Sequence, residues 1–372
     1  MRSSVHQLEL IDDIGARGVQ PEILQASASK RTPRVRYIGS KARIADQLVR
    51  LIGDRTERGR RFVDLFCGSG SVSRAAFAAG WPVHVNDHLY ASTVVAYAQV
   101  VSGRQLNFDN LGGYDAAIQT LNASAPKQGV LYKEYAPSGL SRSGHSRMYF
   151  TEENAEKIDG VRAKIEAWHL TGKIQDNEKT VLLADLISAA NSVANIAGTF
   201  GCFLSRWTPA ALQPLRLYAR HLVERSHAST YSIADAFDFC DDEEDILYCD
   251  PPYTKRQYAA YYHLVETIAL GDFPEVGGVA GIRPWEHNAS PFCYKRRALN
   301  AFERVVLSKR AKKIFFSYSS DAHVALDDLA GTLSKFGRVR IEDVKAIPRY
   351  APNLVSRTNA RPVTEYLIEL VR

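Results

Sequence analysis

The stretch FVDLFCGSG, residues 62–70, predicts a buried strand that runs into a glycine-rich turn. Residues 71–79 follow it with an alanine-rich helical pattern. Strand, turn and helix form the opening unit of a doubly wound α/β sheet, where backbone amides and the helix N-terminus face a ligand. Gly68 and Gly70 let the main chain approach that ligand closely. A lone Gly-x-Gly is weak evidence, so the fold needs support from the rest of the chain.

A second short strand is predicted at residues 81–87, and it ends in Asp87. An acidic residue at this place in such a sheet accepts hydrogen bonds from ribose hydroxyls. The two strands together therefore predict a ligand that contains a ribose.

The apolar run at residues 246–249 leads directly into Asp250, Pro251, Pro252 and Tyr253. An acidic side chain, two prolines that fix the backbone and an aromatic face suit a planar nitrogen base with an exocyclic amino group. Taken alone, the four residues also fit a strand that ends in a proline turn. Their side chains favour chemistry on a nucleobase.

Three motifs follow one another along the chain, at residues 36–41 (RYIGSK), 64–70 (DLFCGSG) and 250–253 (DPPY). In this order they resemble the motifs of the DNA adenine methylase (Dam) family. Residues 148–151 and the tyrosine-rich run after 250–253 are most similar to modification methylases of restriction systems, the FokI methylase type. The resemblance extends from about residue 34 to the C-terminus.

The resemblance implies S-adenosyl-L-methionine as the cofactor and double-stranded DNA as the partner. In the family pattern, residues 64–70 hold the methionine portion of the cofactor and Asp87 meets its ribose. Asp235 meets the amino group of the cofactor's own adenine. The implied cofactor-binding residues are Tyr37, Gly39, Lys41, Asp64, Phe66, Cys67, Gly68, Ser69, Gly70, Asp87, Asp235, Ala236 and Asp250. A cognate restriction endonuclease acting on the same DNA site is a further partner that the resemblance suggests, and we expect a monomer.

The chemistry of residues 250–253 supports the same activity. An adenine amino nitrogen is a poor nucleophile because its lone pair is delocalised into the ring. The Asp250 carboxylate and the Pro251 carbonyl can accept hydrogen bonds from its two protons, which turns the nitrogen toward tetrahedral geometry and aims the lone pair at the sulfonium methyl group. Tyr253 stacks on the base after it leaves the duplex. We therefore predict Asp250, Pro251, Pro252 and Tyr253 as catalytic residues, without a metal.

The spacing of these residues leaves the substrate open. The same clamp can hold cytosine, an RNA base or a protein glutamine, and a non-catalytic nucleic-acid-binding relative would keep the same fold. The intact residues 250–253 argue against a non-catalytic protein. A large insertion favours DNA, because a small substrate would not need it. Methylation of adenine N6 in double-stranded DNA is the leading hypothesis.

Composition and charge are compatible with this hypothesis without proving it. A net charge of +6 and 45% hydrophobic residues among 372 fit a large core and a polyanionic partner, as they fit many soluble proteins. No apolar run reaches membrane-spanning length and residues 1–30 lack a secretory signal pattern, so we expect a cytoplasmic protein. The five cysteines lack paired metal spacing and are expected to be reduced thiols. The acidic run at residues 241–245 is expected to be a solvated turn.

The pattern of elements divides the chain into three regions. Residues 1–33 are predicted to form a mobile arm. Residues 34–103 and 229–372 predict a Rossmann-like methyltransferase sheet with helices on both faces, which makes the fold class α/β. Residues 104–228 predict a mainly helical insertion for target recognition.

Helices in the insertion are predicted after Thr151, a helix-capping residue, and at about residues 180–194. Strands in the second half are predicted at residues 246–249, 313–318, 339–342 and 364–370.

DNA contacts are predicted for basic, polar and aromatic residues in the insertion and after the catalytic motif. Basic groups would meet phosphates, and polar groups would meet base edges. For Asn191, Asn195 and Arg206, solvated surface is an equally good interpretation. The predicted DNA-binding residues are Arg142, Arg147, Asn191, Thr199, Arg206, Lys255, Arg256, Tyr258, Lys295, Arg296 and Arg297.

Overall fold

The computed structural model describes residues 37–53, 60–139, 144–347 and 363–372. The predicted arm at residues 1–33 and the predicted DNA contact Arg142 lie outside these ranges. Within them, none of the helices combines the length and the apolar character that a bilayer span requires.

One sheet has the strand order β3-β2-β1-β4-β5-β7-β6 in the described residues. Strands β3, β2, β1, β4 and β5 are parallel, and β7 runs antiparallel to both β5 and β6. This arrangement confirms the predicted Rossmann-like methyltransferase fold. The strands are β1 Phe62–Asp64, β2 Val83–Asp87, β3 Thr230–Ile233, β4 Ile246–Cys249, β5 Lys313–Ser319, β6 Arg338–Ile347 and β7 Val363–Val371.

The predicted strands of the second half are all present. Strand β4 has the predicted bounds, whereas β5, β6 and β7 extend further than their predicted ranges. Strand β3 was not predicted, because its four residues are exposed or half-buried and lack an apolar run.

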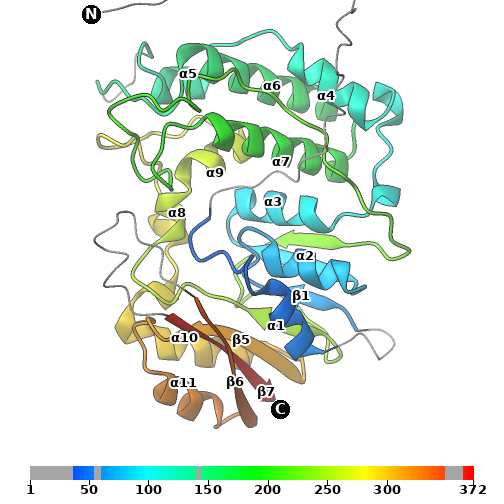
Figure 1. The fold of residues 1–372 in the computed structure, drawn as a ribbon, viewed down its shortest axis with the longest axis vertical. Helices are drawn as coiled ribbons and strands as arrows, with labels where there is room; N and C mark the ends of the chain where they lie inside the picture. Colours follow the sequence, from blue (N-terminus) through cyan, green and yellow to red (C-terminus); the bar gives the residue numbers. More distant parts are fainter. Residues whose placement is uncertain (1–36, 54–59, 140–143, 348–362) are drawn as a thin grey trace, which may run out of the picture.

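Helices cover both faces of the sheet (Figure 1). The α-helices are α1 Ala45–Ile52, α2 Ser71–Ala78, α3 Tyr90–Val100, α4 Tyr114–Asn122, α5 Val130–Tyr135, α6 Glu152–Leu170, α7 Asp176–Val193, α8 Tyr258–Tyr261, α9 His263–Leu270, α10 Lys295–Ser308 and α11 Leu326–Leu333. Helix α6 begins as predicted, because the Thr151 side chain accepts a hydrogen bond from the Asn154 amide. Helix α7 begins before the predicted residue 180, because Gln175 and Glu178 form a capping box.

The hydrophobic core has one part on each face of the sheet. Phe62 packs on the side of α2 and α3, while Val63 and Leu65 pack with α10 and α11 on the other side. Helix α7 packs on α3, and α6 packs on α7, so the helices of residues 104–228 extend the first part of the core (Figure 1). The predicted insertion therefore shares its core with the sheet, and its separate role in target recognition stays a prediction.

A buried ion pair connects this helical layer to the rest of the fold. Two guanidinium nitrogens of Arg220 donate to Asp185 Oδ1 on α7 at 2.9 and 2.6 Å, and a third donates to the Ala98 carbonyl on α3 at 3.0 Å. Tyr114 of α4 also donates to Asp185. Both side chains of the ion pair are almost fully buried. Removal of one charge therefore leaves the other unpaired in the interior.

We expect Arg220→Ala to lower the free energy of unfolding by about 3–5 kcal/mol, because Asp185 would remain as an uncompensated buried carboxylate. Urea unfolding followed by circular dichroism measures this change. The control is Arg104→Ala, which breaks the exposed ion pair with Glu224 and should change stability by less than about 1 kcal/mol. Similar losses in both variants would contradict the prediction.

Candidate active site at the carboxyl end of the sheet

A pocket lies where the strand order reverses, between β1 and β4. Asp64 at the end of β1 is paired in register with Tyr248 of β4, so Asp250 follows at the same edge of the sheet. This is the place where ligands bind in open α/β sheets. The pocket encloses about 650 Å³ of space, part of it open to solvent, and both Asp64 and Asp250 line it.

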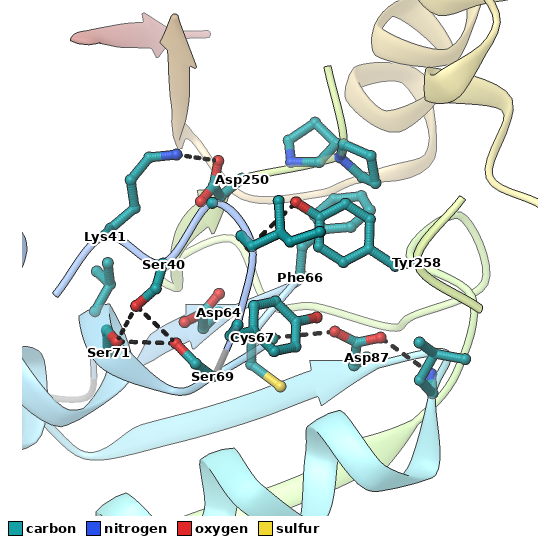
Figure 2. A pocket seen from close by; sticks show the side chains of 18 of the residues that line it. Ser40, Lys41, Asp64, Phe66, Cys67, Ser69, Ser71, Asp87, Asp250 and Tyr258 are labelled. Carbon is teal, nitrogen blue, oxygen red and sulfur yellow. Dashed lines mark hydrogen bonds and ion pairs between the residues drawn. The ribbon is translucent and has the colours of Figure 1, made fainter. Parts of the chain in front are cut away.

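The structure brings most of the predicted site residues together in this pocket (Figure 2). Those that line it are Tyr37, Gly39, Lys41, Asp64, Phe66, Cys67, Gly68, Ser69, Asp87, Asp250, Pro251, Pro252, Tyr253 and Tyr258. The sequence analysis missed seven lining residues, which are Ile38, Ser40, Ser71, Val72, His88, Leu89 and Tyr248. Ile38, Ser40 and Tyr248 lie inside stretches that the sequence analysis quoted without assigning them a role. The other four follow predicted positions within two residues, so a small extension of each motif would have included them.

Two buried carboxylates lie at the ends of β1 and β2. Burial raises the pKa of Asp64 to about 7, against the hydrogen bond from Ser73. The Asp64 Oδ1 atom is buried and has no hydrogen-bond partner, so it can accept a hydrogen bond from a ligand amino group. Asp87 accepts hydrogen bonds from the Gly68 amide at 3.1 Å and the Leu89 amide at 3.0 Å, which fix its carboxylate at the pocket wall.

Three tyrosines hold the N-terminal motif over the pocket. Tyr37 stacks on Tyr262 with ring centroids 4.5 Å apart. The Ile38 amide donates to the Tyr262 hydroxyl at 2.6 Å, and the Tyr258 hydroxyl donates to the Ile38 carbonyl at 3.2 Å. Tyr258, which the sequence analysis placed among the DNA contacts, therefore forms part of the pocket wall and anchors the N-terminal motif.

Lys41 points at the proposed catalytic carboxylate (Figure 2). Its Nζ atom donates to Asp250 Oδ1 at 3.0 Å and to the Tyr253 hydroxyl at 3.1 Å. The sequence analysis placed Lys41 with the cofactor-binding residues, whereas the structure directs its ammonium group to two residues of the predicted catalytic motif. No described residue donates a hydrogen bond to Asp250 Oδ2, which leaves this oxygen for a substrate.

The ion pair between Lys41 and Asp250 shifts the pKa of both groups. Burial raises the pKa of Asp250, and the Lys41 ammonium opposes that shift. Burial alone would lower the pKa of Lys41, but Asp250, Tyr253 and Glu365 raise it well above its usual value. The ammonium group of Lys41 therefore favours the carboxylate form of Asp250, and Asp250 favours the ammonium form of Lys41.

The glycine turn has two separate structural roles. Gly68 has φ +48°, and a Cβ atom there would lie 2.8 Å from Cε1 of Tyr37. Gly70 has φ +72°, and a Cβ atom there would lie 2.7 Å from the Ala96 backbone. Gly70 does not line the pocket, so it serves the packing of α2 against α3 instead of direct ligand contact.

Asp235 and Ala236 do not line the pocket, although both follow β3 at the same edge of the sheet. The Asp235 side chain accepts a hydrogen bond from the Phe237 amide at 3.0 Å and is exposed. A contact between Asp235 and the cofactor remains a prediction.

Two of the predicted DNA contacts are wrong for this structure because their side chains are buried. Arg147 is fully buried and donates to the carbonyls of Glu134, Gly278 and Val279, so it joins α5 to the loop before residue 282. Asn191 is buried on α7. Asn195 is also buried, and its amide group bonds the carbonyls of Met148 and Leu204.

The remaining predicted DNA contacts within the described residues are exposed or half-buried. Arg206 is exposed and Thr199 is half-buried. The other five are exposed basic residues, which we name the basic rim: Lys255, Arg256, Lys295, Arg296 and Arg297. Hydrogen bonds hold the two segments of the basic rim together, since Gln257 and Ser290 bond each other twice and the Cys293 thiol donates to the Arg256 carbonyl.

The fold and the pocket define a Rossmann-like methyltransferase domain. The model of the D12 class N6 adenine-specific DNA methyltransferase family matches residues 37–326. The chain therefore belongs to this family, as the motif order at residues 36–41, 64–70 and 250–253 predicted.

Curated relatives support the same relationship. The type II methyltransferase M.FokI of Planomicrobium okeanokoites is 32% identical over 340 residues, which cover 90% of this chain and 52% of that protein. The modification methylase StsI of Streptococcus sanguinis is 30% identical over 87% of this chain and 50% of its own length. This chain thus spans about half the length of these two relatives. The type II methyltransferase M.NlaIII of Neisseria lactamica is 32% identical over 81% of this chain and 88% of its own length.

We expect Gly68→Ala to weaken binding of S-adenosyl-L-methionine by about tenfold, or roughly 1.4 kcal/mol, because the methyl group would displace Tyr37 and strain the turn. Isothermal titration calorimetry with the cofactor measures the affinity. Gly331→Ala on α11 is the control, because an added Cβ atom there meets no atom within 4 Å. An unchanged affinity in Gly68→Ala would contradict the role given to the turn.

Proposed function

We propose that this chain transfers a methyl group from S-adenosyl-L-methionine to the N6 amino group of adenine at specific sites in double-stranded DNA. The observation that supports this most strongly is the position of Asp250 in the pocket, with Oδ1 held by Lys41 and Oδ2 available to a substrate amino group. Family membership supports adenine as the base. A restriction endonuclease that acts on the same site is the proposed biological partner.

The pocket residues fit the proposed cofactor. The unpartnered Asp64 Oδ1 atom can accept a hydrogen bond from the amino group of the cofactor's methionine portion. Asp87 can accept hydrogen bonds from the ribose hydroxyls. The hydroxyl groups of Ser40, Ser69 and Ser71 lie within 3.3 Å of one another near the start of α2, where they suit a carboxylate. When bound, the cofactor supplies an electrophilic methyl group on a sulfonium sulfur.

The catalytic motif then acts on the flipped base. Asp250 Oδ2 and the Pro251 carbonyl would accept hydrogen bonds from the amino group, which favours tetrahedral geometry at the nitrogen and directs its lone pair at the methyl group. Tyr253 would stack on the base and offset part of the unstacking cost of a few kcal/mol. Its ring is held in place by an edge contact with Tyr318 at 5.8 Å between centroids.

We expect Asp250→Ala to abolish methyl transfer while cofactor binding largely survives. Mass spectrometry of digested plasmid DNA measures N6-methyladenine, and calorimetry measures the cofactor affinity. Asp328→Ala on the exposed face of α11 is the control for the same substitution. Wild-type rates in Asp250→Ala would refute the proposal, and methylated cytosine in place of adenine would correct the substrate.

The basic rim is the proposed phosphate contact beside the pocket. We expect Arg296→Ala to weaken binding to all DNA sequences alike and to reduce the salt slope of the association constant by about 0.9, which corresponds to one phosphate contact on duplex DNA. Fluorescence anisotropy at several salt concentrations measures both. Arg310→Ala, an exposed arginine just beyond the other end of α10, is the control. An unchanged salt slope in Arg296→Ala would place the DNA elsewhere.

A further inference from the structure

A second carboxylate, that of Glu365, lies close to the ammonium group of Lys41. Glu365 of β7 lies outside the span that the family model matches and does not line the pocket. Its Oε2 atom is 3.6 Å from Lys41 Nζ, which itself lies 3.0 Å from Asp250 Oδ1. The ammonium group of Lys41 therefore stands between two carboxylates.

Lys41 has three oxygen neighbours, one for each proton of its ammonium group. A lysine ammonium group has three protons and no acceptor. Its oxygen neighbours are Asp250 Oδ1, the Tyr253 hydroxyl and Glu365 Oε2, and only 4% of its side chain is exposed. The Glu365 Oε2 atom is buried and has no hydrogen-bond partner, so it has room for one more proton.

The surroundings of Glu365 favour a carboxyl group that gains and loses a proton near neutral pH. Burial raises its pKa from 4.5 to about 7, Lys41 opposes the shift, and Asp250 and Asp321 add to it. Across the sheet, Glu365 is in register with Ser319 of β5 and Lys345 of β6. Asp321 follows β5 and bonds the Ser319 hydroxyl.

Methylation of an amino group creates a proton that must leave. The bond between the methyl carbon and sulfur breaks with its electron pair on sulfur, and the nitrogen lone pair forms the new carbon–nitrogen bond. The nitrogen then carries one proton too many, and Asp250 Oδ2 is the base beside it. A buried, protonated Asp250 has to release that proton before it can hold the next substrate.

We propose that Glu365 receives, through Lys41, the proton that the target amino group gives to Asp250. This inference rests on the proposed methyltransferase function. Lys41 gives one proton to Glu365 Oε2, and the Asp250 carboxyl group turns to return a proton to the lysine nitrogen. Asp250 ends as a carboxylate, Lys41 as an ammonium group and Glu365 as a neutral acid. Glu365 then releases the proton to solvent when its carboxyl group turns, because Oε2 itself is buried while 10% of the side chain is exposed.

The test is the single-turnover rate of DNA methylation as a function of pH, measured with saturating cofactor. In the wild type the rate should fall about tenfold per pH unit as the pH drops below about 7, because Glu365 must be ionised to accept the proton. Glu365→Gln keeps the shape and an oxygen for Lys41 but cannot accept a proton. This variant should lower the rate at pH 8 by about 100-fold. It should also remove the fall in rate below about pH 7, which is the acidic limb of the pH profile.

Two further variants separate proton transfer from positioning. Lys41→Arg keeps the positive charge beside Asp250 but does not release a proton, so it should slow the reaction as Glu365→Gln does. Glu369→Gln makes the same change four residues along β7 and should behave as the wild type. Near-wild-type rates with an intact acidic limb in Glu365→Gln would overturn the relay. An inactive wild type would instead overturn the proposed function.

A second measurement needs neither DNA nor catalysis. Because folding raises the pKa of Glu365, its contribution to stability is complete below pH 4.5 and is lost as the pH rises through about 7. The melting temperature of Glu365→Gln should therefore rise relative to that of the wild type between pH 5 and pH 8. Parallel melting profiles over this range would show that Glu365 does not titrate there and would overturn the relay.

Discussion

The parallel pairing of β1 with β4 is the constraint on which the site depends. Because the chain continues from β1 outward to β2 and β3 and then returns to β4, the ends of β1 and β4 meet where no helix connects them directly. The pairing continues past the strand, since the Leu65 amide donates to the Tyr248 carbonyl at 3.0 Å. Asp64 and Asp250, far apart in sequence, are thereby fixed at one edge of the sheet.

That arrangement gathers buried negative charge, which the N-terminal motif offsets. Asp64, Asp87 and Asp250 all have a pKa raised by burial. Lys41 brings one ammonium group into the cluster, and the tyrosines around Ile38 fix the segment that supplies it. The N-terminal motif that lines the pocket thus also favours the ionised form of the proposed catalytic carboxylate.

Much of the fold and most of the pocket could be predicted from the sequence. Apolar strands that end in glycine or acidic residues, as at residues 62–70 and 246–250, leave a strong local pattern. The direction in which a long side chain points leaves no such pattern in the sequence. Arg147 looks like a surface cation in sequence, yet loop carbonyls enclose it, and Glu365 meets Lys41 only through tertiary pairing of β7.

The run at residues 241–245 shows the same limit. It was predicted to be a solvated turn, but Asp241 and Asp245 are buried. Asp245 pairs with Arg61 at 2.8 Å, and Asp241 accepts hydrogen bonds from two backbone amides after α10. Composition alone does not show that the first and last acidic residues of the run turn inward while the three between them stay exposed.

One backbone carbonyl connects the loop after α7 with the segment that follows the proposed catalytic motif. The carbonyl of Phe200, in the loop after α7, accepts hydrogen bonds from the Tyr149 hydroxyl and from His263 at the start of α9. The Phe200 amide in turn donates to the Tyr261 carbonyl. If the loop after α7 contacts DNA, a poorly matched sequence that shifts it would strain the segment that follows Tyr253. Discrimination between DNA sequences would then be expressed in the rate of the chemical step as well as in affinity.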